Sequence, residues 1–312
     1  MIEFFPLETQ LRALTPLWEG ISEYLIAKGG TYDIIPTLQE QAQSSTTGKV
    51  SGIVLQSNRH PVALGWVERI TDCTGNALVY SLHPEFQAPL VKEMVSRGLM
   101  DDIFCELFQF EDTEVYREAF RAQGVHENVR QRMGIYLSNV QFSTKTLPQG
   151  LGFVPLTIAD APAVAKLSAR CHQISRDYVG YKALESEDGR LELEHRIFSG
   201  FYGPVIPESA IKLIKDGRMI GMCVAVEIKC WGYEKVPWIF DVCIEEAEMG
   251  KGYGRLIVEE LLRKLEKSYE VCGLAVTMDN HAARTLYEKL GFMVTDPFYE
   301  YVRFTKGAPI HG

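Results

Sequence analysis

The stretch Glu248-Met-Gly-Lys-Gly-Tyr-Gly-Arg255 places three glycines in five positions, between an apolar run typical of a strand and a periodic run typical of a helix. Glycines let the backbone approach a ligand closely and tolerate positive φ. Because the helix begins where the glycines end, its free N–H groups and positive dipole end point into the same space. Lys251 and Arg255 would add full charges. The stretch predicts an anion cradle that suits a pyrophosphate, although a short Gly-x-Gly-x-Gly is also common in plain tight turns.

The segments around this loop follow an alternating strand and helix pattern. Residues 238–244 read as the strand that leads into the loop, and residues 254–267 as an amphipathic helix. Residues 274–277 form the next expected strand, and a helix capped by Asp279 or Asn280 ends at Gly291. Residues 298–304 alternate as a last strand.

Composition limits the function classes. The chain has 312 residues, 46% of them hydrophobic and 23% charged, which is ordinary for a globular protein of two domains. The net charge of −9 argues against nucleic-acid binding and weakly favours cationic partners such as amines. The sequence has no basic segment before its first apolar patch and no apolar run of membrane-spanning length. We therefore expect a cytoplasmic protein with no membrane partner.

Cysteine and histidine spacing indicates neither disulfides nor a metal site. The seven cysteines are odd in number and include no CxxC pair, so we expect reduced and mostly buried thiols. The seven histidines form no HExxH motif and no zinc-type spacing with cysteine, so no metal is expected.

The N-terminal half reads as a separate α/β arrangement. Residues 7–28 have helical periodicity that is interrupted near Pro16, and residues 50–56 and 62–70 form an expected hairpin. The remaining expected elements are a strand at 77–82, a helix at 89–96, a strand at 104–110 and a helix at 114–123.

Residues 143–152, Ser-Thr-Lys-Thr-Leu-Pro-Gln-Gly-Leu-Gly, lose all periodicity and collect chain breakers, so we predict the domain linker there. Beyond it, residues 154–158 read as a strand, and Asp160 reads as the N-cap of a helix that reaches about residue 170. Residues 210–215 and 219–228 form an expected hairpin around Asp216-Gly217.

Two motifs together resemble the GNAT superfamily of acetyl-CoA-dependent N-acetyltransferases. The first is Met-Gly-Lys-Gly-Tyr-Gly at 249–254, after the strand Asp-Val-Cys-Ile at 241–244. The second is Asn280-His-Ala-Ala-Arg-Thr-Leu-Tyr-Glu-Lys-Leu-Gly-Phe292, which is close to the family's Asn-x-x-Ala-x-x-Leu-Tyr-x-x-Leu-Gly-Phe. The resemblance covers roughly residues 153–306. Met249 departs from the family, which usually has Gln or Arg at this position.

The resemblance implies a binding site for acetyl-CoA as co-substrate. The strands that end at Ile244 and Thr277 would diverge, and the pantetheine arm would lie between them and pair with the backbone of 242–244. The pyrophosphate would lie on 249–255, with Asn280 and Ala283 on the far side. The implied cofactor-binding residues are Val242, Cys243, Ile244, Met249, Gly250, Lys251, Gly252, Tyr253, Gly254, Arg255, Asn280, Ala283 and Tyr287.

The resemblance also implies that Tyr287 is the general acid that protonates the departing thiolate, although a plain core tyrosine fits the same position. Asp241 is the candidate base on the strand before the loop; strand alternation puts it and Val242 on opposite faces unless a bulge intervenes. The segment with His172, Tyr178 and Tyr181 borders the acceptor in this family. Cys243 reads as a buried thiol rather than as a nucleophile.

The N-terminal half looks like a second, degenerate copy. Leu82-His-Pro-Glu-Phe-Gln87 aligns with residues 244–249, and Leu90 and Lys92 then replace the glycines at 252 and 254. Phe120 takes the place of Tyr287. An unrelated α/β domain is the alternative interpretation.

The expected fold is α/β, with two tandem GNAT-like domains, each a mostly antiparallel mixed sheet flanked by helices. The domains are 1–142, without a CoA loop, and 153–312, the catalytic domain, with the linker at 143–152. The expected function is transfer of acetyl from acetyl-CoA to a primary amine, most simply a small molecule, by direct attack. The alternative is a non-catalytic CoA sensor or scaffold. The acceptor's identity and the oligomeric state stay open, a homodimer included.

Overall fold

The computed structural model describes residues 2–27, 34–71, 74–109, 113–143, 147–173 and 186–305. The chain divides into two compact units. Unit 1 comprises Met1–Asn128 and Phe298–Gly312, and unit 2 comprises Val129–Pro297. The strands of each unit pair as a mixed region of sheet with helices on both faces.

The two halves of the sequence repeat the same order of elements: a strand, two helices, three strands, a helix, a strand, a helix and a strand. The first half contains β1 (Ile2–Pro6), α1 (Thr15–Ala27), α2 (Ile35–Gln43), β2 (Val50–Ser57), β3 (His60–Arg69), β4 (Thr74–Ser81), α3 (Gln87–Ser96), β5 (Phe104–Gln109), α4 (Thr113–Ala122) and β6 (His126–Tyr136). The second half contains β7 (Leu151–Pro155), α5 (Ala161–Gln173), α6 (Glu187–Phe198), β8 (Ile211–Lys215), β9 (Arg218–Cys230), β10 (Tyr233–Ile244), α7 (Tyr253–Leu265), β11 (Val271–Thr277), α8 (His281–Leu290) and β12 (Met293–Val302). The repeat expected from the sequence is confirmed.

Each sheet takes its sixth strand from the other half of the sequence. In unit 2 the order is β7-β8-β9-β10-β11-β6, and β6 pairs with β11 antiparallel from Arg130↔Thr277 to Tyr136↔Val271. In unit 1 the order is β1-β2-β3-β4-β5-β12, with Glu300 and Tyr301 of β12 opposite Glu106 and Cys105 of β5. The halves have therefore exchanged their last strands, and both sheets are mostly antiparallel.

The end of β12 is held in unit 1 by side chains as well as by pairing. Tyr301 is fully buried and stacks on Phe120 with ring centroids 4.5 Å apart. Arg303, just after the strand, makes two hydrogen bonds to Asp101, at 2.5 and 2.7 Å. Packing and a bidentate ion pair thus fix the C-terminal strand.

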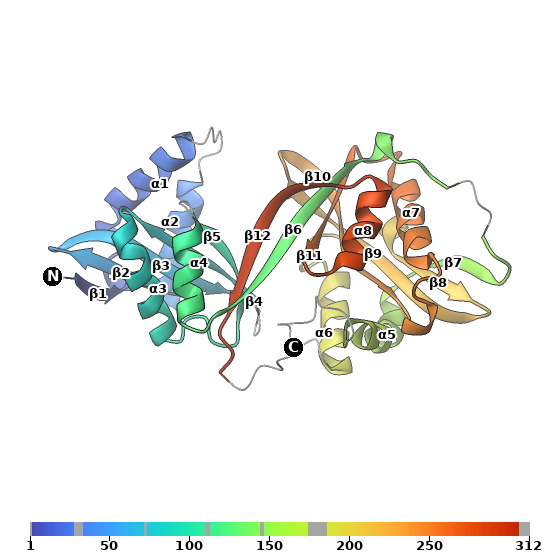
Figure 1. Cartoon of the computed structure of the whole chain (residues 1–312), viewed down its shortest axis with the longest axis horizontal. Helices are drawn as coiled ribbons and strands as arrows, with labels where there is room; N and C mark the ends of the chain where they lie inside the picture. The colour runs from blue at the N-terminus through green and yellow to red at the C-terminus, as the bar shows by residue number, and fades with distance from the viewer. Residues whose placement is uncertain are drawn as a thin grey trace. The chain divides into compact units, whose positions relative to one another are not determined.

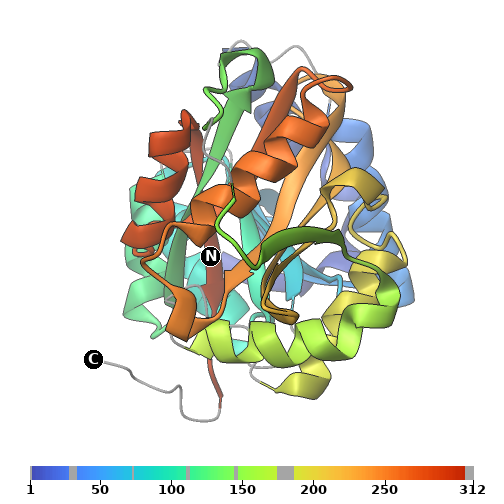
Figure 2. The ribbon, with the colours of Figure 1, turned by 90° about the vertical axis from the view of Figure 1, so that its right-hand side faces the viewer.

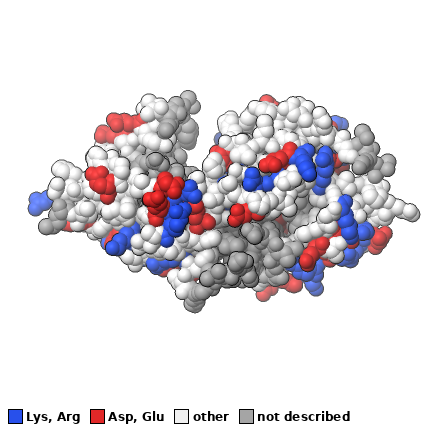
Figure 3. All heavy atoms as spheres, viewed as in Figure 1, with Lys and Arg blue, Asp and Glu red and all other residues white. Residues whose placement is uncertain are grey.

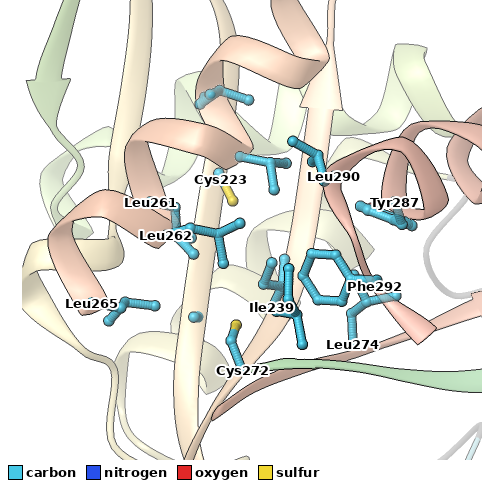
Figure 4. Packing of buried hydrophobic residues seen from close by; sticks show 14 of the residues in the cluster. Cys223, Ile239, Leu261, Leu262, Leu265, Cys272, Leu274, Tyr287, Leu290 and Phe292 are labelled. Atoms are coloured by element: carbon cyan, nitrogen blue, oxygen red, sulfur yellow. The ribbon is translucent and has the colours of Figure 1, made fainter. Parts of the chain in front are cut away.

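In unit 2, α7 and α8 cover one face of the sheet, and α5 and α6 cover the other (Figures 1 and 2). The α7–α8 side contains Ile239 of β10 and Leu274 of β11, which pack on apolar residues of both helices (Figure 4). The α5–α6 side contains Cys243 of β10 with Val164 and Ile197 from the helices. Alternation along β10 therefore directs successive side chains to different helix layers.

Unit 1 has the same layers, with α3 and α4 on one face and α1 and α2 on the other. Its two parallel strands, β4 and β5, pair along six registered positions, from Thr74↔Phe104 to Val79↔Gln109. Helix α3 begins at Gln87, with no glycine loop before it, and Leu90 of α3 is fully buried. β4 and β5 therefore stay paired at the position where the corresponding strands of the second half are expected to separate around a cofactor.

Several local predictions need correction. The first helix is Thr15–Ala27 rather than 7–28, because Pro16 lies in the first turn, where it needs no N–H partner. Thr157, not Asp160, is the N-cap before α5, and Asp160 completes a capping box with it. The expected linker, 143–152, ends inside β7; the domain limits stay a prediction.

Candidate active site

A cavity of about 850 Å³ opens in unit 2 where β10 and β11 separate. The two parallel strands pair only at Trp238↔Gly273 and Ile239↔Leu274. Beyond these positions β10 continues to Ile244 and β11 to Thr277, and residues of both diverging segments line the cavity. An extended ligand in this gap can pair with the edge of β10 as an added strand does.

The glycine loop forms one wall of this cavity. Gly250 and Gly252 have φ of 75° and 83°, and a Cβ at either would meet no atom within 4 Å. The left-handed backbone, not crowding, thus requires glycine here. Gly252 caps α7, and the first N–H that donates back along the helix belongs to Leu256, at 3.2 Å from the Gly252 carbonyl. The preceding N–H groups and the positive end of the α7 dipole are available for an anion.

Ion pairs of the Glu248 carboxylate anchor the glycine loop. The Glu248 carboxylate accepts hydrogen bonds from Lys215 Nζ, at 2.9 and 3.1 Å, and from Lys251 Nζ, at 3.0 Å. These hydrogen bonds lower the pKa of Glu248. Lys251 is the one predicted cofactor-binding residue that does not line the cavity, because its ammonium group turns back to Glu248 and to the Ala247 carbonyl at 2.8 Å.

The other predicted loop residues lie at the cavity. Arg255 lines it but donates from Nε to the buried Glu259 at 2.6 Å, so its charge is already compensated. Met249 and Tyr253 also line the cavity, and the Met249 side chain is exposed. Gly254 lies inside α7, where a Cβ would stand 3.5 Å from Leu286, an ordinary contact. An anion at the loop would therefore meet mainly backbone N–H groups.

A β-bulge in β10 determines which face of the sheet Asp241 lies on. Relative to β9, the register shifts between Ile239 and Asp241, which adds one residue to β10 at Phe240. Asp241 is 8% exposed, lines the cavity, and accepts a hydrogen bond from Ser168 Oγ of α5 at 3.2 Å. Asp241 thus faces the α5–α6 layer, whereas Val242 packs in the α7–α8 layer.

Helix α8 forms another wall of the cavity. Tyr287 lines the cavity and is 9% exposed, and its ring makes an edge contact with Phe292 at 5.7 Å between centroids (Figure 4). Asn280 and Ala283 also line the cavity, and the Asn280 side-chain oxygen caps α8 by accepting from the Ala283 N–H at 3.1 Å. Asn280, rather than Asp279, is therefore the N-cap of α8.

Cys243 and Ile244 complete the predicted wall on β10. The contact with Cys171 and burial hold the pKa of the Cys243 thiol well above its usual range. A protonated thiol is a weak nucleophile, which agrees with a structural role. Cys171 of α5 also lines the cavity and donates from Sγ to the Ile244 carbonyl at 3.1 Å. Cys171 cannot be singled out from the sequence, because a lone cysteine in a helix carries no specific functional signal.

Arg130 is a second lining residue that sequence reasoning missed. It belongs to β6, and its Nη2 donates to the Ala275 carbonyl of β11 at 3.3 Å. The polar run His126-Glu-Asn-Val-Arg-Gln-Arg does not alternate as a half-buried strand, so no strand was predicted there. The side chain of His172, and Tyr178 and Tyr181, lie outside the described residues.

On the face shown in Figure 3, basic and acidic side chains are interspersed. Among the residues that the structure describes, no three His, Cys, Asp or Glu side chains converge as metal ligands. Within those ranges, no helix has the length and apolar character needed to cross a bilayer.

Comparisons with known proteins agree with this geometry. Residues 172–292 match the family model of the acetyltransferase (GNAT) family. A search of curated protein sequences finds no match. Among solved structures, a GCN5-related N-acetyltransferase from Sphaerobacter thermophilus is 13% identical with a TM-score of 0.60, and the match covers 96% of this chain and 94% of that one.

Two further structures are similar over the same extent. A tandem GNAT protein from the clavulanic acid biosynthesis pathway is 15% identical with a TM-score of 0.52, covering 96% of this chain and 98% of that one. A glucosamine N-acetyltransferase region of a fungal multi-domain β-N-acetylglucosaminidase is 12% identical with a TM-score of 0.56, covering 96% of this chain and 38% of that one. Such identities show a common fold. Residues 172–292, with the glycine loop and Tyr287, therefore match the acetyltransferase (GNAT) family model, in a chain that has the fold of the tandem GNAT protein.

Proposed function

We propose that this protein transfers the acetyl group of acetyl-CoA to a primary amine by direct attack. The observation that carries the proposal is the gap between β10 and β11, which holds a cavity of about 850 Å³ and has a glycine loop and a helix N-terminus in its wall. The volume lies in the range of ordinary small-molecule sites. The free edge of β10 suits an extended amide arm, and the glycine loop suits a pyrophosphate. A cofactor that carries both groups therefore matches the cavity.

The chain's own residues then have distinct roles. The loop at 249–255 would hold the pyrophosphate through backbone N–H groups, and the edge of β10 at 242–244 would pair with the pantetheine arm. Asn280 and Ala283 would border the arm on the α8 side. Asp241 would accept the proton that the amine loses, and Tyr287 would donate its hydroxyl proton to the departing sulfur.

Isothermal calorimetry with acetyl-CoA tests the binding step. We expect wild type to bind and Gly252→Glu to lose at least about 30-fold in affinity, because a carboxylate in the loop repels the pyrophosphate. Gly232→Glu is the matched control: Gly232 has φ of 80°, open space around its Cβ, and a place in the β9–β10 turn, at the other end of β10 from the loop. No binding by wild type, or equal binding by both variants, contradicts the proposal.

A panel of small primary amines, with release of the CoA thiol as the readout, tests the transfer step. Amine-dependent release by wild type supports acetyl transfer. Binding of acetyl-CoA with only slow, amine-independent release supports the non-catalytic alternative instead.

A further inference from the structure

The cavity is lined by residues from both faces of the unit 2 sheet, and the proposed function has not yet placed the acceptor in it. Leu274 and Val276 of β11 pack in the α7–α8 layer, so alternation turns Ala275 to the opposite face. Phe240 of β10 packs in the α5–α6 layer, and both Phe240 and Ala275 line the cavity. The cavity therefore continues through the gap between β10 and β11 to the α5–α6 side.

On that side, Phe240 and Ala275 mark the point where the two strands separate. The last registered pair is Ile239↔Leu274, so Phe240 and Ala275 are the next residues along β10 and β11. The extra residue of the β10 bulge is Phe240, and the following residue, Asp241, lies on the same face. One strand thus brings an aromatic ring to the opening and the other brings only a methyl group.

The same face is filled by indole rings before the strands separate. A Cβ at Gly273 of β11 would lie 2.6 Å from Cε3 of Trp238 and 2.7 Å from Cη2 of Trp231. A Cβ at Gly134 of β6, which pairs with Gly273, would lie 3.1 Å from the same Trp231 atom. The two indoles therefore occupy the surface of these glycines, and the open part of this face begins at the residues that follow along β10 and β11.

A second aromatic ring fixes the orientation of Phe240. Tyr202, in the turn after α6, packs against Phe240 with ring centroids 4.7 Å apart and ring planes at 35°. Tyr202 is held in turn by an edge contact with Phe201, at 4.9 Å between centroids. A ring that is held in this way gives the cavity a planar apolar surface, and such surfaces bind other aromatic rings by offset stacking or edge contact.

We propose that the acceptor is a primary amine that carries an aromatic ring, and that this ring lies between Phe240 and Ala275 on the α5–α6 side of the cavity. The inference rests on the proposed amine acetylation and names its substrate class. Because Asp241, the base of the proposed function, directly follows Phe240, an amine that reaches it has its substituent beside the Phe240 ring. Phe240 and Ala275 are specificity residues, since they would contact the substituent and not the reacting atoms.

The first test compares 2-phenylethylamine with ethylamine, two primary amines that differ only by the ring. With saturating acetyl-CoA and release of the CoA thiol as the readout, we expect kcat/KM for 2-phenylethylamine to be higher by at least about tenfold, the discrimination that an apolar pocket gives. Equal kcat/KM values in wild type overturn the inference and leave acetylation itself intact.

Three variants locate the discrimination. Ala275→Leu fills the space for the ring and Phe240→Leu removes the planar surface, so in each the ratio of the two kcat/KM values should fall below about threefold. Phe198→Leu is the matched control, because Phe198 of α6 belongs to the same apolar layer but not to the cavity wall. It should keep the wild-type ratio. A ratio that is unchanged in both cavity variants, or lost equally in the control, overturns the inference.

The second test needs no turnover. Saturation-transfer NMR of 2-phenylethylamine with the protein alone should show transfer to the ring protons for wild type and Phe198→Leu. Transfer should be lost for Ala275→Leu, whose added side chain takes the place of the ring. Absence of transfer in wild type, or equal transfer in Ala275→Leu, overturns the site.

The two tests separate this inference from the proposed function. If acetyl-CoA does not bind, or if neither amine is acetylated, the proposed function fails while the NMR series still reports whether the cavity holds an aromatic amine. If both amines are acetylated with equal kcat/KM, the inference alone fails.

Discussion

Tyr287 is part of the hydrophobic core and also lines the cavity. Its ring belongs to the α7–α8 layer, so packing alone is enough to explain an aromatic residue at this position. The hydroxyl is what distinguishes it from Phe120, its counterpart in the other half, which is fully buried against Tyr301. A change that keeps the ring and removes the hydroxyl therefore separates catalysis from packing.

We expect Tyr287→Phe to lower kcat by about 100-fold or more, the usual effect of losing a general acid. The affinity for acetyl-CoA should change less than about twofold, since the ring still fills its place. Steady-state kinetics and calorimetry measure the two quantities. Tyr233→Phe is the control, because that hydroxyl contacts Glu270 at the far end of β10. A parallel loss of kcat and affinity assigns Tyr287 to packing.

At the level of the elements, the attachment of the glycine loop before α7 depends on one carboxylate, that of Glu248. Glu248 holds Lys215 of β8 and Lys251 of the loop, so it ties the glycine loop to the sheet. The lowered pKa of Glu248 means that this tie is present above the ordinary glutamate pKa and is lost as the pH falls through the lowered value. Glu248, the first residue of the stretch 248–255, also lines the cavity, and its two ion pairs position the loop.

Removal of this charge should loosen the loop. We expect Glu248→Gln to weaken acetyl-CoA binding by about 3- to 10-fold, because a less ordered loop loses more freedom on binding. Amide hydrogen exchange at 249–252 should become faster. Glu234→Gln, which breaks the exposed Lys229–Glu234 pair in another turn, should change neither quantity. Unchanged exchange in Glu248→Gln would show that the glycines alone fix the loop.

For the whole molecule, the exchanged strands make the two halves interdependent. Seven registered residues of β6 belong to the sheet of unit 2, although they precede the expected linker at 143–152. The fragment 147–312 lacks this strand, and its β11 then presents an unpaired edge.

A cut in the linker tests this dependence. We expect the two pieces to stay associated in native size-exclusion chromatography after cleavage at a protease site inserted behind Leu147, and to separate only in denaturant. Fragment 147–312 expressed alone should be unstable or insoluble, and co-expression with fragment 1–143 should restore it. Fragments that separate under native conditions would rule out the exchange.

The sequence predicts the two repeats and nearly every wall of the cavity, because glycine loops, caps and apolar alternation are local signals. It does not predict the exchange of strands. The pairing of Thr277 with Arg130 depends on contacts across 147 residues of chain, and β6 itself is too polar to be recognised by alternation. The burial of Glu194 in α6 is not predicted either, since a glutamate in a charged helix looks like any solvated residue until its burial is known.

The strand that completes unit 1 is synthesised after the whole of unit 2. Residues 298–302 leave the ribosome after residues 129–297, so β5 emerges first and must wait with one edge uncovered. Completion of unit 1 is thereby coupled to the synthesis of unit 2. A chain interrupted within unit 2 would leave unit 1 incomplete as well, and the cell's quality control would meet a single defective molecule instead of one finished domain and one missing domain.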